Sequence, residues 1–330
     1  MKDKASNFIL IVFLILLLLS ITLFIYGIIS PGTIPSWIGT QEYTNNKGET
    51  IVAPKTLWDL MSLLIIPVSL AVIAFLFNRS EKQIEHERLM REKEKEEQRT
   101  DDINQETLLR EYINTMSVLM TEKALISSEP ESPVRIVART ITKVTAHQLT
   151  GKRKAVIMRF LKEADLVDIN KTVVALAGAD FRRAELDNTN LSAINLAGTN
   201  FSGASFDRAN LTRIIFANSN LSGASLCNTT LRQTKFTRAN LSGAEITESH
   251  FDGTDLIRAD LTKAILCRSV FIDVKLNGAD LREANMCGAD FSRAKLDGAK
   301  LTGAEADVTT TWPENFDAKS NGIVLIGRKD

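Results

Sequence analysis

The stretch TNFSGASFDRANLTRIIFANSNLSGA (Thr199–Ala224) decides the fold. A large apolar residue recurs in it at every fifth position, as at Phe201 and Leu211, and the residue two places before each is small or β-branched. The same step runs from Leu176 to Leu301 without an insertion or deletion, and all but two of its 26 positions hold Leu or Phe. A period of five fits neither an α-helix, at 3.6, nor a β-strand, at 2. It therefore indicates a repeat architecture.

Several of the five-residue units share the pattern A(D/N)LXX. Examples are ANLSG (Ala239–Gly243), TDLIR (Thr254–Arg258), ADLTK (Ala259–Lys263) and ADFSR (Ala289–Arg293). The sequence resembles the pentapeptide-repeat family, and the register holds over 126 residues. This resemblance implies a right-handed, four-sided β-helix, a β-solenoid with one pentapeptide on each side and four in each coil.

Side-chain size sorts with a period of twenty residues, which supports four pentapeptides per coil independently of the resemblance. At steps of twenty, one column of small residues is entirely alanine, another is entirely β-branched, and one set of large residues is entirely phenylalanine. These columns are Ala184, Ala204, Ala224, Ala244, Ala264, Ala284 and Ala304; Ile194, Ile214, Thr234, Thr254 and Val274; and Phe251, Phe271 and Phe291. Stacking of equivalent faces requires such sorting.

The repeat pattern also predicts which side chains point inward. The central Leu or Phe and the small residue before it face the core, and the other three positions face out and are polar. Stacked coils bury their core together, with backbone hydrogen bonds along the axis at a spacing of about 4.8 Å. Glycines are expected at the corners, where a residue without a Cβ eases the turn. These are Gly203, Gly223, Gly243 and Gly303.

The amino-acid composition limits the number of domains and the classes of function, but it does not indicate a binding partner. The 330 residues are enough for two or more domains, and 40 basic residues balance 40 acidic ones. A formal net charge of zero gives no global field that would select nucleic acid or a membrane. Three cysteines exclude a disulfide framework.

Two apolar segments precede the repeats and are predicted to be transmembrane helices. Phe8–Ile29 has 22 residues, enough to span a bilayer, and Leu57–Phe77 is the second run. A cleaved signal peptide is the alternative for the first, but the run is long and no A-x-A site follows it. We expect a cytoplasmic N-terminus and first span at 1–30, an extracytoplasmic loop at 31–56 and a second span at 57–78.

Lysine and arginine residues set the expected orientation of these spans. The N-terminal side holds Lys2 and Lys4, and the loop holds Lys47 and Lys55. The segment after the second span is richer, with six basic residues: Arg79, Lys82, Arg88, Arg91, Lys93 and Lys95. Both ends are therefore predicted to be cytoplasmic, in an integral membrane protein that crosses the bilayer twice.

The region 79–163 is predicted to form a charged helical stalk and a helical cap. Pairs such as Glu87–Arg91 and Arg88–Glu92 lie four residues apart on one helical face. Asp101 and Asp102 are expected to cap a next helix, Ser132-Pro133 to start another, and Gly151 to end that one. Such helices can cover the open first coil of the solenoid at 164–306.

After the repeats, 307–330 is predicted to form a C-terminal cap, with Trp312 or Phe316 over the last coil. The segments Lys55–Arg79, Glu111–Leu125 and Ser132–Thr140 are similar to those of a membrane-anchored subgroup of pentapeptide-repeat proteins, common in cyanobacteria and related bacteria. The function of that subgroup is largely unassigned, so this similarity implies architecture and no activity.

The sequence nominates no catalytic, cofactor-binding or metal-binding residue. The histidines His86, His147 and His250 lie in three different segments, without a cysteine pair. The cysteines share one exterior column, because they differ in number by 40 and 20. A thiol column could sense oxidants or bind a soft metal, but cysteine also replaces serine at this position, and we favour the second interpretation. The three residues are Cys227, Cys267 and Cys287.

Three classes of function follow from these features. The first, which we favour, is a non-enzymatic adaptor tethered to the bilayer by both spans, which binds an unidentified protein at the cytoplasmic face; a homo-oligomer is left open. The second is DNA mimicry, used by some family members to occupy a topoisomerase, but the stretch 164–306 holds 17 acidic and 16 basic residues, far from a DNA-like charge. We therefore expect no nucleic-acid partner. The third, an enzyme, would need a pocket that a filled solenoid lacks.

Overall fold

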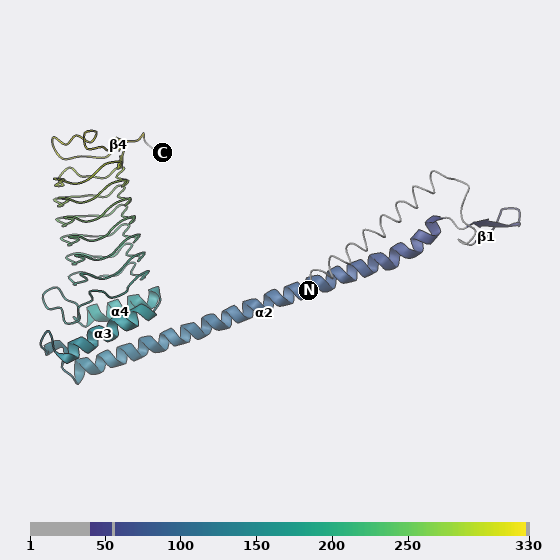
Figure 1. Cartoon of the computed structure of the whole chain (residues 1–330), viewed down its shortest axis with the longest axis horizontal. Helices are drawn as coiled ribbons and strands as arrows, with labels where there is room; N and C mark the ends of the chain where they lie inside the picture. Colours follow the sequence, from purple (N-terminus) through teal and green to yellow (C-terminus); the bar gives the residue numbers. More distant parts are fainter. Residues whose placement is uncertain (1–39, 55–56, 328–330) are drawn as a thin grey trace. The chain divides into compact units, whose positions relative to one another are not determined.

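The computed structural model describes residues 40–54 and 57–327 (Figure 1). The chain divides into two compact units, Met1–Glu96 and Glu97–Asp330. The first unit contains an antiparallel hairpin of β1 (Thr40–Thr44) and β2 (Thr50–Pro54), with Thr44 opposite Thr50. The Asn45 side chain accepts hydrogen bonds from the amides of Lys47 and Glu49, at 2.9 and 3.0 Å, and so orders the turn. The sequence predicted only a loop at 31–56.

Helix α2 runs unbroken from Leu57 to Thr121. The prediction that Asp101 and Asp102 begin a separate helix is therefore wrong, because both lie within α2. Asp101 instead accepts a hydrogen bond from Gln105 at 2.9 Å, and Asp102 pairs with Arg153 of a later helix at 3.2 Å. The predicted four-apart ion pairs of the stalk are present, each at 3.3 Å: Arg88–Glu92 and Glu87–Arg91.

Within residues 40–54 and 57–327, no helix is both long enough and apolar enough to cross a membrane. The predicted second span, 57–78, is thus not supported. The predicted first span, Phe8–Ile29, lies outside the described residues.

The end of α2 and three shorter elements form a helical cap at the start of the solenoid (Figure 1). These elements are η2 (Leu125–Ser127), α3 (Pro133–Gln148) and α4 (Gly151–Glu163). Tyr112 joins them: its ring meets Phe160 edge-on at 6.0 Å, and its hydroxyl lies 3.1 Å from the Thr142 hydroxyl. Burial raises the pKa of the Tyr112 phenol, so this group stays protonated.

Gly151 begins α4 and does not end α3, which corrects the prediction for this residue. Its carbonyl oxygen accepts a hydrogen bond from the Glu185 amide at 3.2 Å. A Cβ at this position would lie 2.4 Å from the Arg183 carbonyl oxygen. Glycine therefore allows the helical cap to approach the first coil closely.

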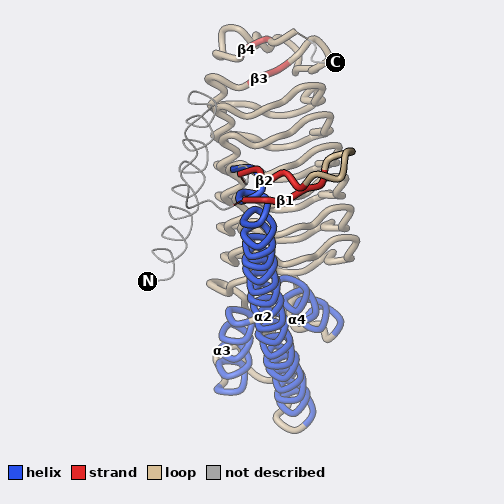
Figure 2. Tube along the Cα trace, turned by 90° about the vertical axis from the view of Figure 1, so that its right-hand side faces the viewer, coloured by secondary structure: helices blue, strands red, loops and turns tan. Residues whose placement is uncertain are grey.

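The repeats form stacked coils whose equivalent residues are twenty apart (Figure 2). Parallel bridges join Asp180 to Asn200 and Asn200 to Asn220, and the series continues to the end of the repeats. The Phe181 amide donates to the Asn200 carbonyl oxygen at 2.8 Å, as expected for neighbouring rungs. The twenty-residue period and the β-solenoid are confirmed.

The core is filled by the central residues and the small residues before them. Phe201, Leu241 and Phe271 are fully buried. Phenylalanines stack along one face, with ring centroids 4.7 Å apart for Phe251–Phe271 and 4.4 Å for Phe271–Phe291. This inward arrangement is the one that the five-residue pattern predicted.

The corners are β-turns, and in the series from Gly178 to Gly303 the third residue has a positive φ at every corner except Arg293. In one of them the Ala204 amide donates to the Phe201 carbonyl oxygen at 2.9 Å, and Gly203 has φ 64°, as in a type II turn. The expected corner glycines are confirmed. Many corners hold other residues in the same conformation, such as Arg208 at φ 59° and Arg213 at φ 60°, which the sequence analysis did not anticipate.

The regular repeat ends with one inserted residue. Asp290 pairs with Thr311, a separation of 21, and β3 (Glu305–Ala306) pairs in parallel with β4 (Val324–Leu325). Trp312 stacks on Phe291 at 5.4 Å. Phe316 stacks on Trp312 at 5.0 Å, so both aromatic residues extend the phenylalanine stack beyond the last regular coil.

Candidate interaction surface

One side of the solenoid carries the same short, uncharged side chains on three successive coils. We call this surface the Asn–Ser–Gly face. Each rung has Asn before the central residue, then Ser and Gly after it. The residues are Asn200, Ser202 and Gly203; Asn220, Ser222 and Gly223; and Asn240, Ser242 and Gly243.

Hydrogen bonds within the turns fix the three Asn side chains. The Asn200 and Asn220 side-chain oxygens each accept a hydrogen bond from the amide two residues later, at 3.1 Å, and the equivalent bond of Asn240 is 2.9 Å. Such bonds within the backbone turn are the reason for Asn or Asp at this position. The face is consequently flat and already ordered.

The Asn–Ser–Gly face can bind a partner at low entropic cost. Its Ser and Asn side chains are partly exposed and short, and its glycines are exposed at the corners. Little rotamer freedom remains to be lost when a partner covers it. The same side becomes charged further along, where Arg282 pairs with Asp280 at 2.7 Å. The uncharged surface therefore covers only three coils of this side and gives way to charged residues beyond them.

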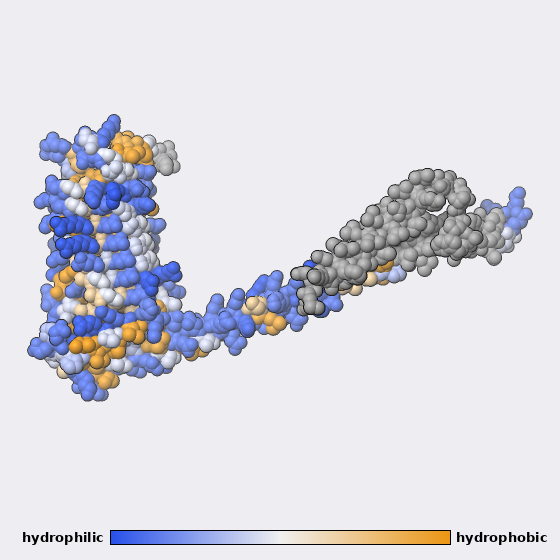
Figure 3. Space-filling model, in the orientation of Figure 1, coloured by the Kyte–Doolittle hydropathy of each residue, from blue (hydrophilic) through white to orange (hydrophobic). Residues whose placement is uncertain are grey.

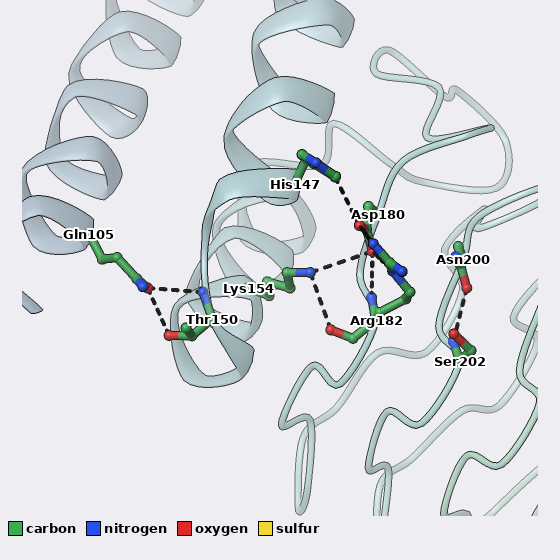
Figure 4. Close-up of polar contacts among 8 residues, drawn as sticks. All are labelled: Gln105, His147, Thr150, Lys154, Asp180, Arg182, Asn200 and Ser202. Atoms are coloured by element: carbon green, nitrogen blue, oxygen red, sulfur yellow. Dashed lines mark hydrogen bonds and ion pairs between the residues drawn. The ribbon is translucent and has the colours of Figure 1, made fainter. Parts of the chain in front are cut away.

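A partly buried ionic cluster lies on the same side at its N-terminal end (Figure 4). Asp180 occupies the position of Asn200 in the coil before. It pairs with Arg182 at 2.8 Å, with Lys154 of α4 at 3.5 Å and with His147 of α3 at 3.0 Å. Lys154 also donates to the Arg182 carbonyl oxygen at 3.2 Å. The cluster thus fixes both cap helices to the first coil.

Burial and neighbouring charges shift the pKa values of Asp180 and Lys154 in opposite directions. Burial raises the pKa of the Asp180 carboxyl, but hydrogen bonds from Arg182 and the Lys154 charge outweigh it and hold that pKa well below its usual range. Burial lowers the pKa of Lys154, against the attraction of Asp180. A compensated pair of this kind is typical of a structural contact, and it leaves no free group for acid–base chemistry.

Ion pairs between neighbouring coils balance the charge on other sides. Arg268 pairs with Glu248 at 2.9 Å, and Arg293 with Asp273 at 2.7 Å. Each pair joins residues twenty apart, one rung above the other. In these pairs an acidic side chain is matched with a basic one along the axis, unlike the continuous negative rows of a DNA backbone.

The three cysteines lie in one exterior column, as predicted, and their side chains are partly buried. The Cys267 sulfur lies 3.3 Å from the Asn285 side-chain oxygen. Burial raises the pKa of the Cys267 thiol, which disfavours the reactive thiolate. Nothing in this geometry activates the column for catalysis.

The histidines remain apart in the structure. His147 belongs to the Asp180 cluster, His86 is exposed on α2, and His250 is exposed on the solenoid. Among the described residues, no three His, Cys, Asp or Glu side chains are grouped to hold a metal ion. A hollow of about 660 Å³ between α2 and α4 has apolar residues on its floor, including Leu109 and Val156, and an Arg153–Asp102 pair at its rim.

Comparisons with known proteins agree with this geometry. The sequence profile described as "Pentapeptide repeats" matches with eight copies between residues 175 and 303. A pentapeptide repeat protein from Nostoc PCC 7120, alr5209, is 36% identical over 34% of this chain and 84% of its own, with a TM-score of 0.17. No curated protein matches the chain.

Two further solved structures match the chain at lower identity. Full-length QnrB1, a plasmid-mediated fluoroquinolone resistance protein, is 17% identical over 46% of this chain and 91% of its own, with a TM-score of 0.31. HetL from Nostoc sp. PCC 7120, a pentapeptide repeat protein involved in heterocyst differentiation regulation, is 24% identical over 46% and 80%, with a TM-score of 0.20. From its repeats, their twenty-residue coils and the alr5209 relative, the chain belongs to the pentapeptide-repeat family.

Proposed function

We propose that the chain is a non-enzymatic adaptor whose Asn–Ser–Gly face binds another protein. The observation that carries this proposal is three successive rungs of identical, uncharged and pre-ordered side chains, centred on Ser222. Figure 3 shows that hydrophilic residues cover most of the visible side of the solenoid. Polar recognition through backbone-fixed side chains suits a protein partner, because an ordered surface loses little entropy on binding.

We also propose that the N-terminal region holds the adaptor at a membrane. Phe8–Ile29 is apolar over 22 residues. The start of α2 supports the proposal, because its large apolar side chains are exposed between 68 and 77: Val68, Leu70, Ile73, Phe75, Leu76 and Phe77. Exposed apolar side chains in such number need a lipid or protein partner. Tethering would raise the effective concentration of the solenoid near other membrane proteins.

DNA mimicry is the alternative, and the charge of the repeats disfavours it. The stretch 164–306 holds 17 acidic and 16 basic residues. Duplex DNA carries one negative charge per roughly 1.7 Å of axis, so a mimic needs a large excess of acidic residues. Inhibition of a topoisomerase by the purified full chain would favour this alternative over the adaptor.

Photo-crosslinking in the native membrane tests the adaptor. A photo-reactive residue replaces Ser222 in the full chain, and the matched control replaces Thr212, which lies half a coil away on the opposite side. We expect one discrete adduct from position 222 and none from position 212. An additional Ser242→Arg substitution should remove the adduct. Equal adducts from both positions, or none from position 222, would contradict the proposal.

A further inference from the structure

Two of the three cysteines occupy neighbouring rungs of their column. Cys267 and Cys287 are twenty residues apart, and the Arg268 amide donates to the Cys287 carbonyl oxygen at 3.0 Å. Neighbouring rungs lie about 4.8 Å apart, within the ~4.4–6.8 Å between Cα atoms that a disulfide spans. Cys227 is two rungs from Cys267, at about 9.6 Å, which exceeds that span. The column therefore holds one pair of cysteines that a disulfide can bridge.

The Cys267 side chain is directed toward the rung of Cys287. Its thiol donates to the Asn285 side-chain oxygen at 3.3 Å, and the Cys287 amide donates to that same oxygen at 3.1 Å. Burial raises the pKa of the Cys267 thiol, and a hydrogen bond from the Cys287 backbone acts against this rise. The Cys267 sulfur is thus held against the backbone of the other cysteine, in the direction that a bridge requires.

The hydrogen bonding of the column does not explain why cysteine stands at these rungs. Earlier in the column, the Asp187 side-chain oxygen accepts a hydrogen bond from the Asp207 amide at 3.0 Å, and the Asp207 side chain accepts one from the Cys227 amide at 3.0 Å. A thiol is a weak acceptor and replaces a carboxylate poorly in such a bond. At the rung of Cys287 the side chain of Asn285 accepts the amide hydrogen instead. Reactivity is therefore a better explanation for the pair than turn structure.

We propose that Cys267 and Cys287 form a reversible disulfide within the chain, and that a small-molecule disulfide such as oxidised glutathione is the oxidant. Both residues are partly exposed, so a small oxidant can reach them from solvent. A structural zinc site would need four ligands, whereas no three His, Cys, Asp or Glu side chains are grouped for a metal in the part of the chain that the structure describes. The modification goes beyond the proposed adaptor function and does not rest on it.

The reaction is thiol–disulfide exchange in two steps. Cys287 gives its proton to water, and its thiolate attacks one sulfur of glutathione disulfide, which breaks the S–S bond and releases one glutathione thiolate. Cys267 then loses its proton and attacks the Cys287 sulfur, which forms the protein disulfide and releases the second glutathione. Two protein thiols are oxidised, and glutathione disulfide is reduced to two thiols. The buried Cys267 suits the second step, because the sulfur that it attacks is held on the next rung.

Equilibration of the reduced full chain with mixtures of reduced and oxidised glutathione tests the proposal. The reaction is stopped with acid, the remaining thiols are alkylated, and the chain is cut with trypsin for mass spectrometry. The three cysteines fall in separate tryptic peptides, at 214–232, 264–268 and 283–293. Cys227→Ser is the matched control that keeps the pair. Cys287→Ser removes it and leaves Cys227 and Cys267 two rungs apart.

We expect a disulfide between the peptides 264–268 and 283–293, reversed by dithiothreitol and formed equally in the natural chain and in Cys227→Ser. Cys227 should remain alkylated. In Cys287→Ser, half-modification of Cys267 should need at least about tenfold more oxidised glutathione, because the intramolecular step is gone. In concentrated urea all three pairings should appear. Failure of the 267–287 disulfide to form, glutathione retained on either residue, a disulfide between chains, or equal oxidation of Cys227 in the folded chain would overturn the proposal.

Discussion

At the scale of single residues, the five-residue register assigns each side chain to the core or the exterior. Leu241 is fully buried, and Asn220 is partly exposed with its side-chain oxygen bound to the Ser222 amide. The two residues differ in their place within the repeat and not in their secondary structure. Substitutions at these two positions therefore test directly whether the five-residue register is assigned correctly.

Leu241→Asp should destabilise the solenoid by at least about 4 kcal/mol, because it buries a carboxylate without a partner. Asn220→Asp should be near neutral, since Asp260 and Asp280 accept the equivalent turn hydrogen bond in later coils. Chemical denaturation of the two variants measures the difference. Similar losses of stability would mean that the inward and outward positions are misassigned.

Gly223→Val should cost about 1–2 kcal/mol, because Gly223 has φ 62°, a conformation that a β-branched residue rarely adopts. A Cβ at this position meets nothing within 4 Å, so the cost is conformational and not steric. Gly223→Asn is the control and should be nearly tolerated, as Asn218 has φ 58° in the preceding unit. Thermal melts in which Val and Asn behave alike would rule out conformational strain.

The Asp180 cluster predicts a loss of stability in acid. In the folded chain the pKa of the Asp180 carboxyl lies below its value of about 4 in the unfolded chain. The unfolded chain therefore takes up the proton first as the pH falls. The stabilisation by Asp180 is thus present above pH ~4 and is lost as the pH drops toward the folded pKa. Asp180→Asn should therefore lose less stability than the natural chain between pH 5 and pH 3 in urea unfolding. Exposed Glu314→Gln serves as the control, and equal pH slopes for all three proteins would refute this role.

At the scale of elements, the caps close a core that a single coil leaves open. Trp312 lies on Phe291 at 5.4 Å and supports Phe316. Trp312→Ala should cost roughly 2 kcal/mol, less than the ~3–5 kcal/mol of a fully buried aromatic residue, because Trp312 is half-buried. Hydrogen exchange should accelerate at the last coil and stay unchanged near Phe201. Uniform acceleration along the solenoid would indicate that the cap is not a local element.

An element could be predicted from the sequence where a strict local spacing of residues determines it, and not where its structure depends on distant contacts. The solenoid follows a strict step from Leu176 to Leu301, so its core and corners could be assigned without a structure. The hairpin at Thr40–Pro54 could not be predicted, because its turn residues also occur in irregular loops. The continuity of α2 through Asp101 could not be predicted either, because an Asp that can cap a helix also occurs within longer helices. The pairing of Lys154 with Asp180 depends on how α4 sits on the first coil, which no spacing in the sequence reports.

The candidate surface could have been recognised from the sequence, because the twenty-residue period that aligns Cys227, Cys267 and Cys287 also aligns the residues of the Asn–Ser–Gly face. The repeat rule allows Asn, Asp, Ser, Thr and charged residues at the outward positions. It says nothing of which outward positions form a shared face until the twenty-residue coil brings them into register. Asn200, Asn220 and Asn240 then become neighbours on successive rungs, joined by the parallel bridges Asn200↔Asn220 and Asn220↔Asn240.

At the scale of the whole molecule, both the fold and the proposed adaptor surface depend on a coil of twenty residues. Deleting 221–240 removes one complete coil and joins Asn220 to Leu241, which restores the pattern of both the core and the Asn–Ser–Gly face. Deleting 221–238 removes two residues fewer and breaks the five-residue step. The two deletions are close in length and composition, but only the first keeps every remaining side chain on its face.

The most direct measurement is the melting temperature of these two full-length deletion variants, followed by circular dichroism. The twenty-residue deletion should fold and melt cooperatively, within a few degrees of the natural chain, with a solenoid shorter by about 4.8 Å. The eighteen-residue deletion should lose the cooperative transition of the solenoid. Equal behaviour of the two variants, or unfolding of the twenty-residue deletion alone, would contradict the twenty-residue coil and the interaction surface built on it.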